Sequence, residues 1–291
     1  MLDFEYSAPK TLEKAVALLS EQGVNAKVLA GGTDVLVQLR GGRFAIDRLV
    51  DVKHVPELNQ LSCSASDGLV LGAAVPCYRI YEDRKVSSLY TGLIDSAAMI
   101  GGIQIQGRAS VGGNLCNSSP SGDTIPSLIA LEATCVIAGP KGQRTLPVEQ
   151  FCTGPGRNVL GPGEVLVALR FPAPKARSGA HYLRFIPRNE MDIAVAGVGA
   201  SVVLDQSKKR IVSARIALAA VGPTPIFAQE AGDLLAGKQA NETSFEEAAA
   251  VATAAAKPID DMRGTARQRA HLAGVLTKRA LRTAVQRAME G

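Results

Sequence analysis

Apolar residues recur along the first hundred positions with spacings that predict both helices and strands. From Leu12 to Leu19 they fall at intervals of three and four residues, typical of one helix face, and Gly23 suits the end of that helix. The same reading predicts helices over residues 34–39 and 88–100. Short continuous apolar runs predict buried strands at residues 27–30, 49–52 and 69–73.

The rest of the chain reads as strands followed by helices. Apolar runs predict strands at residues 135–138, 165–171, 182–185, 194–204 and 211–220. The sequence Ser244-Phe-Glu-Glu247 has the form of a capping box and predicts a helix that ends before Pro258, and a last helix is expected from about Thr265. We find no convincing internal repeat, and the predicted fold class is α+β.

A domain boundary is predicted at residues 172–179, where proline, glycine and charged residues cluster. Before it, residues 101–123 form a glycine-rich polar segment that reads as one long connection. Connections of that length inside a compact domain usually carry function.

Two glycine pairs carry the clearest chemical signal. Gly31-Gly32 stands between a predicted strand and a predicted helix, where successive backbone amides can point into one concavity and bind anionic oxygen. Next to it, Thr33 offers a hydroxyl, and Asp34 suits a backbone cap or a sugar hydroxyl. Gly112-Gly113 repeats these ingredients, with neighbouring hydroxyl, amide and carboxylate groups in residues 110–123.

Two such loops suit a dinucleotide, whose two phosphates need more than one cradle. The pattern is not the G-x-G-x-x-G of a Rossmann fold, and it has no Walker lysine. A dinucleotide-binding fold of another type is therefore indicated. The alternative is that both glycine pairs merely turn the chain.

Composition narrows the class of protein only slightly. Hydrophobic residues make up 46% of the chain and charged residues 20%, as in ordinary globular proteins. The net charge of +5 permits a nucleic-acid or phosphate-binding module, but no basic stripe is interleaved with aromatic residues. Much of the positive charge falls on the predicted last helix, which we interpret as a solvated face or a contact with an acidic partner.

The cysteines and the apolar runs exclude several other classes. None of the five cysteines lies within four residues of another, so we expect neither a metal site nor an iron–sulfur cluster in this chain. The acidic N-terminus is unlike a signal peptide, and the longest apolar run, residues 193–204, is too short to span a bilayer. We expect a cytoplasmic protein with no membrane insertion and no nucleic-acid partner.

Several motifs, in order along nearly the whole chain, resemble the FAD-binding subunits of the xanthine dehydrogenase and carbon monoxide dehydrogenase family of molybdenum hydroxylases. The motifs are Leu29-Ala-Gly-Gly-Thr-Asp-Val-Leu36, Ser110-Val-Gly-Gly-Asn-Leu115, Pro120-Ser-Gly-Asp123, Tyr182-Leu-Arg-Phe185 with Arg188, Met191-Asp-Ile-Ala194 and Pro258-Ile-Asp-Asp-Met-Arg263. The resemblance implies an FAD-binding domain of the vanillyl-alcohol oxidase (PCMH) type over residues 1–174, with subdomains of about 1–57 and 58–174. It also implies a smaller α+β domain over residues 178–291.

The resemblance also implies an FAD site. The pyrophosphate would be wrapped by Leu29, Ala30, Gly31, Gly32, Thr33, Asp34 and Val35. The facing loop would comprise Ser110, Gly112, Gly113 and Asn114, and Ser119 and Asp123 would add polar contacts to the phosphate and ribityl region. Leu166 would lie beside the adenine half, Ile100 and Gly101 near the isoalloxazine ring, and Arg184 and Asp192 would complete the set.

Two positions in this set depart from many relatives. Ile100 stands where some have an aromatic residue, and Arg184 where many have lysine. The second change keeps the charge but replaces a point donor with a planar fork. Both leave the redox potential and the electron acceptor open.

By the same resemblance, the chain is an electron-transfer subunit with no catalytic side chain of its own. A large partner subunit would hold the molybdopterin, and a small one two [2Fe-2S] clusters, in a heterotrimer. The flavin would pass electrons to NAD, oxygen or a quinone. The basic last helix is a candidate docking surface, through Arg279 and Arg282.

The runner-up interpretation is a self-sufficient FAD-dependent oxidase or dehydrogenase of the same fold. It requires a base over the flavin, for which only His181 and Tyr182 are candidates. Covalent attachment of the flavin would require Cys116, the one suitably placed cysteine.

Overall fold

Three short parallel strands form the first sheet of the computed structural model. The structure describes residues 3–291, so Met1 and Leu2 of the acidic N-terminus lie outside it. β1 (Glu5–Ser7) and β2 (Ala26–Leu29) both pair with β3 (Arg48–Asp51), which gives the order β1-β3-β2. The helices α1 (Leu12–Leu19) and α2 (Val35–Arg40) supply the crossovers that parallel strands require.

A five-stranded antiparallel sheet follows, with the order β4-β5-β10-β6-β7. Its strands are β4 (Leu61–Ser64), β5 (Gly68–Gly72), β6 (Thr134–Gly139), β7 (Gly142–Pro147) and β10 (Val165–Phe171). Short helices connect β5 to β6: α3 (Cys77–Glu82), α4 (Arg84–Leu89), α5 (Thr91–Ala97), α6 (Ile103–Gln106), α7 (Val111–Asn117) and α8 (Ile125–Ala130). The minor elements are η1 (Pro56–Asn59), η2 (Val148–Gln150), β8 (Cys152–Gly154) and β9 (Arg157–Asn158).

The two faces of this sheet bury different cores. On β6, Cys135 and Ile137 pack with the helices, whereas Val136 and Ala138 pack with α1 and the first sheet. This alternation follows from the two-residue period of a strand.

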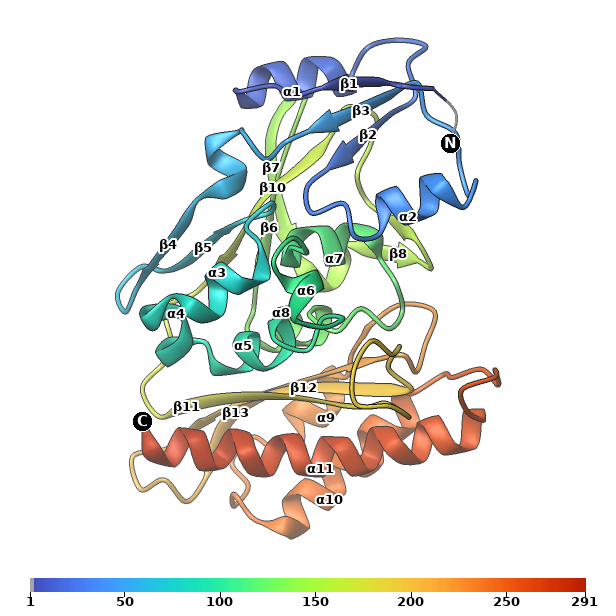
Figure 1. Cartoon of the computed structure of the whole chain (residues 1–291). Coiled ribbons are helices and arrows are strands. Elements are labelled where there is room, and N and C mark those ends of the chain that lie inside the picture. Colours follow the sequence, from blue (N-terminus) through green and yellow to red (C-terminus); the bar gives the residue numbers. More distant parts are fainter. Residues whose placement is uncertain (1–2) are drawn as a thin grey trace.

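The C-terminal part is a four-stranded antiparallel sheet with the order β11-β12-β13-β14. Its strands are β11 (Ser178–Phe185), β12 (Ala196–Leu204), β13 (Ile211–Ala219) and β14 (Ile226–Phe227), and its helices are α9 (Gln229–Asp233), α10 (Glu242–Ala255) and α11 (Ala266–Glu290). Figure 1 shows the sheet sandwiched between α11 and the helices that precede β6. Both of its faces are therefore covered, which explains why β12 is buried almost throughout.

Most predicted strands and helices are confirmed within two residues of their predicted ends, but three local predictions are wrong. The helix predicted over residues 88–100 breaks at Tyr90, whose buried side chain donates a hydrogen bond to the carbonyl of Pro172 at 2.8 Å. Residues 101–123 are not one long loop, since they contain α6 and α7. The first of the two last helices is capped by Asn241, which accepts the Ser244 amide at 3.1 Å, and begins at Glu242.

The interpretation of α11 as a solvated basic face is also wrong for Arg269 and Arg287, whereas Lys278 and Arg282 stay at the surface. Arg269 is 4% exposed and donates to the carbonyl of Val195 at 2.8 Å. The other three form ion pairs within the chain: Lys278 with Glu246, Arg282 with Glu242, and Arg287 with Asp95. Arg269 and Arg287 attach α11 to the rest of the chain, whereas the pairs of Lys278 and Arg282 lie at the surface and contribute little.

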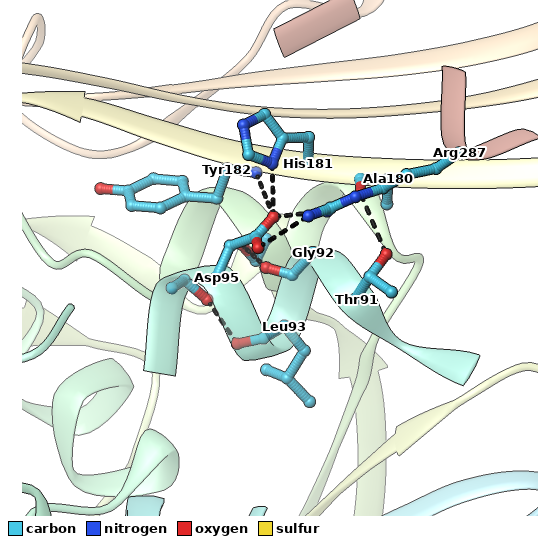
Figure 2. A network of polar contacts seen from close by, with 10 residues as sticks. Thr91, Gly92, Leu93, Asp95, Ala180, His181, Tyr182 and Arg287 are labelled. Atoms are coloured by element: carbon cyan, nitrogen blue, oxygen red, sulfur yellow. Dashed lines mark hydrogen bonds and ion pairs between the residues drawn. The ribbon is translucent and has the colours of Figure 1, made fainter. Parts of the chain in front are cut away.

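Asp95 joins the two halves of the molecule (Figure 2). Its carboxylate, on α5, accepts hydrogen bonds from Arg287 of α11 and from His181 of β11. The Tyr182 amide also donates to it, at 3.2 Å. Burial raises the pKa of Asp95, but the hydrogen bonds from His181 and Arg287 outweigh that effect and leave the pKa lowered.

Candidate functional site

The first glycine loop presents free backbone donors. It runs from the end of β2 to the start of α2, and Gly32 takes a left-handed conformation with φ of 82°. In the part of the chain that the structure describes, the amides of residues 31–35 have no hydrogen-bond acceptor. Such a run of free amides at a helix start is suited to an anion.

Asp34 does not cap α2, although the sequence allowed that role. Its side chain makes no capping hydrogen bond and lies in the wall of the cavity described below. Burial raises the pKa of this carboxyl group. Of the two roles considered for Asp34, the structure is compatible with a contact to a sugar hydroxyl and not with a backbone cap.

The second glycine loop becomes the start of α7. Ser110 caps this helix by accepting the amide of Gly113 at 3.0 Å. A Cβ atom on Gly112 would lie 2.5 Å from the carbonyl oxygen of Ala73, so only glycine allows this close approach. Asn114 accepts from the buried hydroxyl of Thr124 at 2.7 Å through its oxygen, which leaves its amide nitrogen as a donor.

The two loops touch each other directly. Arg108 donates from Nε to the carbonyl of Gly31 at 3.0 Å. A Cβ atom on Gly31 would overlap the carbonyl oxygen of Arg108, so the contact requires glycine there. A second link joins α2 to α7, where Gln38 donates to Asn117 at 3.1 Å. The loops therefore form one binding region.

A cavity of about 610 Å³ lies between the loops, within the usual range for small-molecule sites. Twelve of the residues predicted for the site line it: Ala30, Gly31, Gly32, Thr33, Asp34, Val35, Ile100, Ser110, Gly112, Gly113, Asn114 and Leu166. Apolar and polar surfaces both contribute, which suits a ligand with a planar ring system and a charged link.

The sequence interpretation missed one wall of the cavity. Leu166 was the one residue predicted for the site in the segment from Gly156 to Leu166, yet Asn158 and Leu160 also line the cavity. The signal available was Gly161-Pro162-Gly163, a turn ahead of β10. Arg43 and Lys27 also line the cavity and add positive charge.

Six predicted site residues do not line this cavity. Leu29 directly precedes the lining residue Ala30, and Gly101 directly follows the lining residue Ile100. Asp123 and Arg184 form a buried ion pair at 2.6 Å, and Tyr182 donates to the same carboxylate at 2.8 Å. Burial raises the pKa of Asp123, and Arg184 and Tyr182 oppose that shift.

The remaining two lie outside both clusters. Ser119 is 3.3 Å from the hydroxyl of Ser121. Asp192 pairs with Arg188 at 3.2 Å.

Neither side chain considered as a base lines the cavity. His181 is bonded to Asp95 at 2.5 Å, and Tyr182 is fully buried against Asp123. Burial raises the pKa of the Cys116 thiol, in the cavity wall, to about 12. His181 and Tyr182 are therefore placed away from the cavity, and a protonated thiol is a poor nucleophile.

Comparison with known proteins assigns the class. Residues 2–174 match the family described as the FAD binding domain in molybdopterin dehydrogenase. Residues 181–284 match the CO dehydrogenase flavoprotein C-terminal domain. The fold and the site thus define an FAD-dependent oxidoreductase subunit. The chain belongs to the family of FAD-binding subunits of carbon monoxide and xanthine dehydrogenases.

Relatives match over nearly their full length. The carbon monoxide dehydrogenase medium chain of Hydrogenophaga pseudoflava is 34% identical over 97% of this chain and 96% of that protein. A putative xanthine dehydrogenase FAD-binding subunit of Escherichia coli is 32% identical over 98% of this chain and 97% of that protein. The solved carbon monoxide dehydrogenase of Hydrogenophaga pseudoflava superposes with a TM-score of 0.93 at 33% identity, covering 98% of each chain.

The described residues, 3–291, lack two features. They contain no helix long and apolar enough to cross a membrane. They also contain no group of three or more His, Cys, Asp or Glu side chains placed to hold a metal ion.

Proposed function

We propose that this chain is the flavin relay of a heteromeric molybdopterin-containing dehydrogenase or hydroxylase. In this role it accepts electrons from [2Fe-2S] clusters on a small partner subunit. It passes them through FAD to an external acceptor such as NAD, oxygen or a quinone. The observation that carries the proposal is the cavity between two touching glycine loops, with the free amides of residues 31–35 on one side.

The residues of this cavity fit FAD. The amides of residues 31–35 would bind the diphosphate, with Asn114 as a further donor. Leu166 would lie beside the adenine half, and Ile100 and Gly101 beside the isoalloxazine ring. Bound FAD supplies the redox chemistry, whereas the side chains position it and set its surroundings.

The Asp123–Arg184 pair has a separate place in the proposal. It lies one residue from Thr124, which orients Asn114 in the cavity wall. Ser119 and Asp192 would contribute to the rim on the same side. These four residues would therefore support the site without lining the cavity itself.

The domain organisation that we propose has an FAD-binding domain of the PCMH type over residues 1–174, in subdomains of about 1–57 and 58–174. A C-terminal domain over residues 178–291 follows. The separate first, central and C-terminal sheets support this division. The large molybdopterin subunit would oxidise the substrate of the complex in the cytoplasm.

The test is an absorption spectrum of the full chain after addition of FAD and desalting. Gly32→Val and Gly113→Val are compared with the wild type, and Gly107→Ala serves as control because nothing lies within 4 Å of its added Cβ. We expect flavin bands in the wild type and the control, and none in the two valine variants. Flavin retained by both valine variants would refute this assignment of the site. Oxidation of an organic substrate by the isolated yellow chain would instead support a self-sufficient oxidase.

A further inference from the structure

A buried glutamine supports the turn between α5 and α6. Gln106 is only 7% exposed, and its Nε2 donates to the carbonyl of Ala98 at 2.7 Å and to that of Ile100 at 3.2 Å. On its other side, Oε1 accepts from the hydroxyl of Tyr81 at 3.3 Å. The carboxamide thus links the carbonyls of Ala98 and Ile100, in the turn, to the Tyr81 hydroxyl of α3.

The orientation of this carboxamide follows from its partners. Carbonyl oxygens only accept, so the two carbonyls must face the NH₂ group, and the Tyr81 hydroxyl then donates to the oxygen. Both protons of Nε2 are used. An apolar side chain at position 106 would leave two backbone acceptors without this donor, in a region where water is largely excluded.

The supported turn reaches the cavity through Ile100. Ile100 lines the cavity, and its own carbonyl is one of the two acceptors. Gly101 follows in a left-handed conformation, with φ of 56°, and a Cβ there would lie 3.0 Å from the side chain of Ile105. The backbone at Ile100 is therefore fixed by the hydrogen bond from Gln106, and the residue after it has a conformation that favours glycine.

We infer that Gln106 is a positioning residue for the flavin, acting through the Ile100–Gly101 turn. This inference rests on the proposed function, because it takes that turn to lie beside the isoalloxazine ring. Gln106 does not itself line the cavity. Its carboxamide sets where the turn meets the ring, and so influences both the affinity for FAD and the electronic surroundings of the flavin.

The test compares Gln106→Leu with Gln104→Leu in the full chain, isolated with any subunits that assemble with it. Gln104 is exposed on the same short helix, so its replacement controls for helix propensity. We expect Gln106→Leu to raise the Kd for FAD by about five- to tenfold, the loss of one to two buried hydrogen bonds. The visible circular dichroism of bound flavin should change as well. Gln104→Leu should leave both unchanged.

Two further variants keep the test informative if Gln106→Leu folds poorly. Tyr81→Phe removes only the hydroxyl that donates to Gln106, and should change the flavin spectrum in the same direction by a smaller amount. Gln106→Glu places a carboxylate against two carbonyls. It should weaken FAD binding at neutral pH and recover relative to wild type as the pH falls, because a protonated acid donates again. The recovery should be partial, because the protonated acid has one proton for the two carbonyls.

A cofactor-free measurement separates this inference from the proposed function. Hydrogen exchange of the amides in residues 98–105 should be faster in Gln106→Leu than in Gln104→Leu before FAD is added. Equal exchange and equal flavin spectra in these two variants would overturn the inference while Gly32→Val still decides the FAD site. A wild type that holds no flavin in any assembly would overturn both.

Discussion

Asp95 and Arg287 lie 192 residues apart in the sequence and form a two-pronged ion pair, with nitrogen–oxygen distances of 2.6 and 3.0 Å. Arg287 also donates to the carbonyl of Ala180 at 2.7 Å, and Thr91 donates to that carbonyl at 3.2 Å. A planar guanidinium is suited to serving a carboxylate and a carbonyl together. The end of α11 is thereby attached to α5, which leads directly to the Ile100–Gly101 turn.

Replacing Arg287 should destabilise the fold without removing the FAD site. We expect Arg287→Ala to lower the free energy of unfolding by about 2 kcal/mol, between the values for exposed and fully buried pairs. Arg279→Ala, an exposed arginine on the same helix, should change it by less than about 0.5 kcal/mol. Urea denaturation of both variants, of Asp95→Asn, and of the double variant Asp95→Asn/Arg287→Ala measures the coupling. Additive effects in that double variant would show that the pair contributes nothing.

The contact between the two glycine loops predicts a strict requirement at Gly31. Gly31→Ala should force the Arg108 backbone away and weaken FAD binding by roughly tenfold, a typical cost of overpacking converted to affinity. Gly107→Ala, one residue before Arg108, adds the same methyl group in open space and should bind FAD like the wild type. Fluorescence quenching of added FAD gives both constants. Equal affinities would mean that the loops separate without cost.

The ion pair of Glu164, in the cavity wall, predicts that the stability of the fold depends on pH. Arg144, which donates to it at 2.7 Å through both Nε and Nη2, lowers the pKa of Glu164 to about 2. A lowered pKa stabilises the fold fully above the ordinary value of 4.5 and progressively less as the pH falls towards 2. Glu164→Gln should therefore melt below the wild type at pH 7, with a difference that shrinks between pH 4.5 and about 2. A difference in Tm that stays constant across that range would contradict the pairing.

Flavin bound to this chain should be releasable. Cys116 is the cysteine considered for covalent attachment, and the high pKa of its buried thiol keeps it protonated at neutral pH. Acid precipitation should leave all yellow colour in the supernatant, for the wild type and for Cys116→Ser alike. Flavin that stays in the wild-type pellet but leaves the Cys116→Ser pellet would establish a covalent link.

Local signals in the sequence were sufficient for the two glycine loops and for most strands. The Gly31-Gly32 turn could be predicted from the glycine pair itself and from the helix that follows, because both signals lie in neighbouring residues. The break at Tyr90 was not predictable in this way, because the partner of its side chain, the Pro172 carbonyl, lies far along the chain. The same holds for the cavity wall from Gly156 to Leu166, which tertiary packing brings to the loops.

Charge was the least informative signal. The cations of α11 read as a solvated face because their acidic partners, such as Glu242 and Asp95, lie on other elements. The missed role of Asp123 is similar: its contacts with Tyr182 and Arg184 cross from one half of the molecule to the other. Sequence spacing carries no record of such pairings until the fold is known.

The contacts that join the C-terminal sheet to the first half have a practical consequence for the segment between them. Thr91 donates to the carbonyl of Ala180 at the start of the C-terminal sheet, and the Asp95–Arg287 pair fastens the far end of α11. Covalent continuity through Ala173 and Pro174 then adds little to the attachment. A protease that nicks this segment should yield two fragments that migrate together on a sizing column and separate only in denaturant, so the two halves can be made as separate polypeptides and recombined.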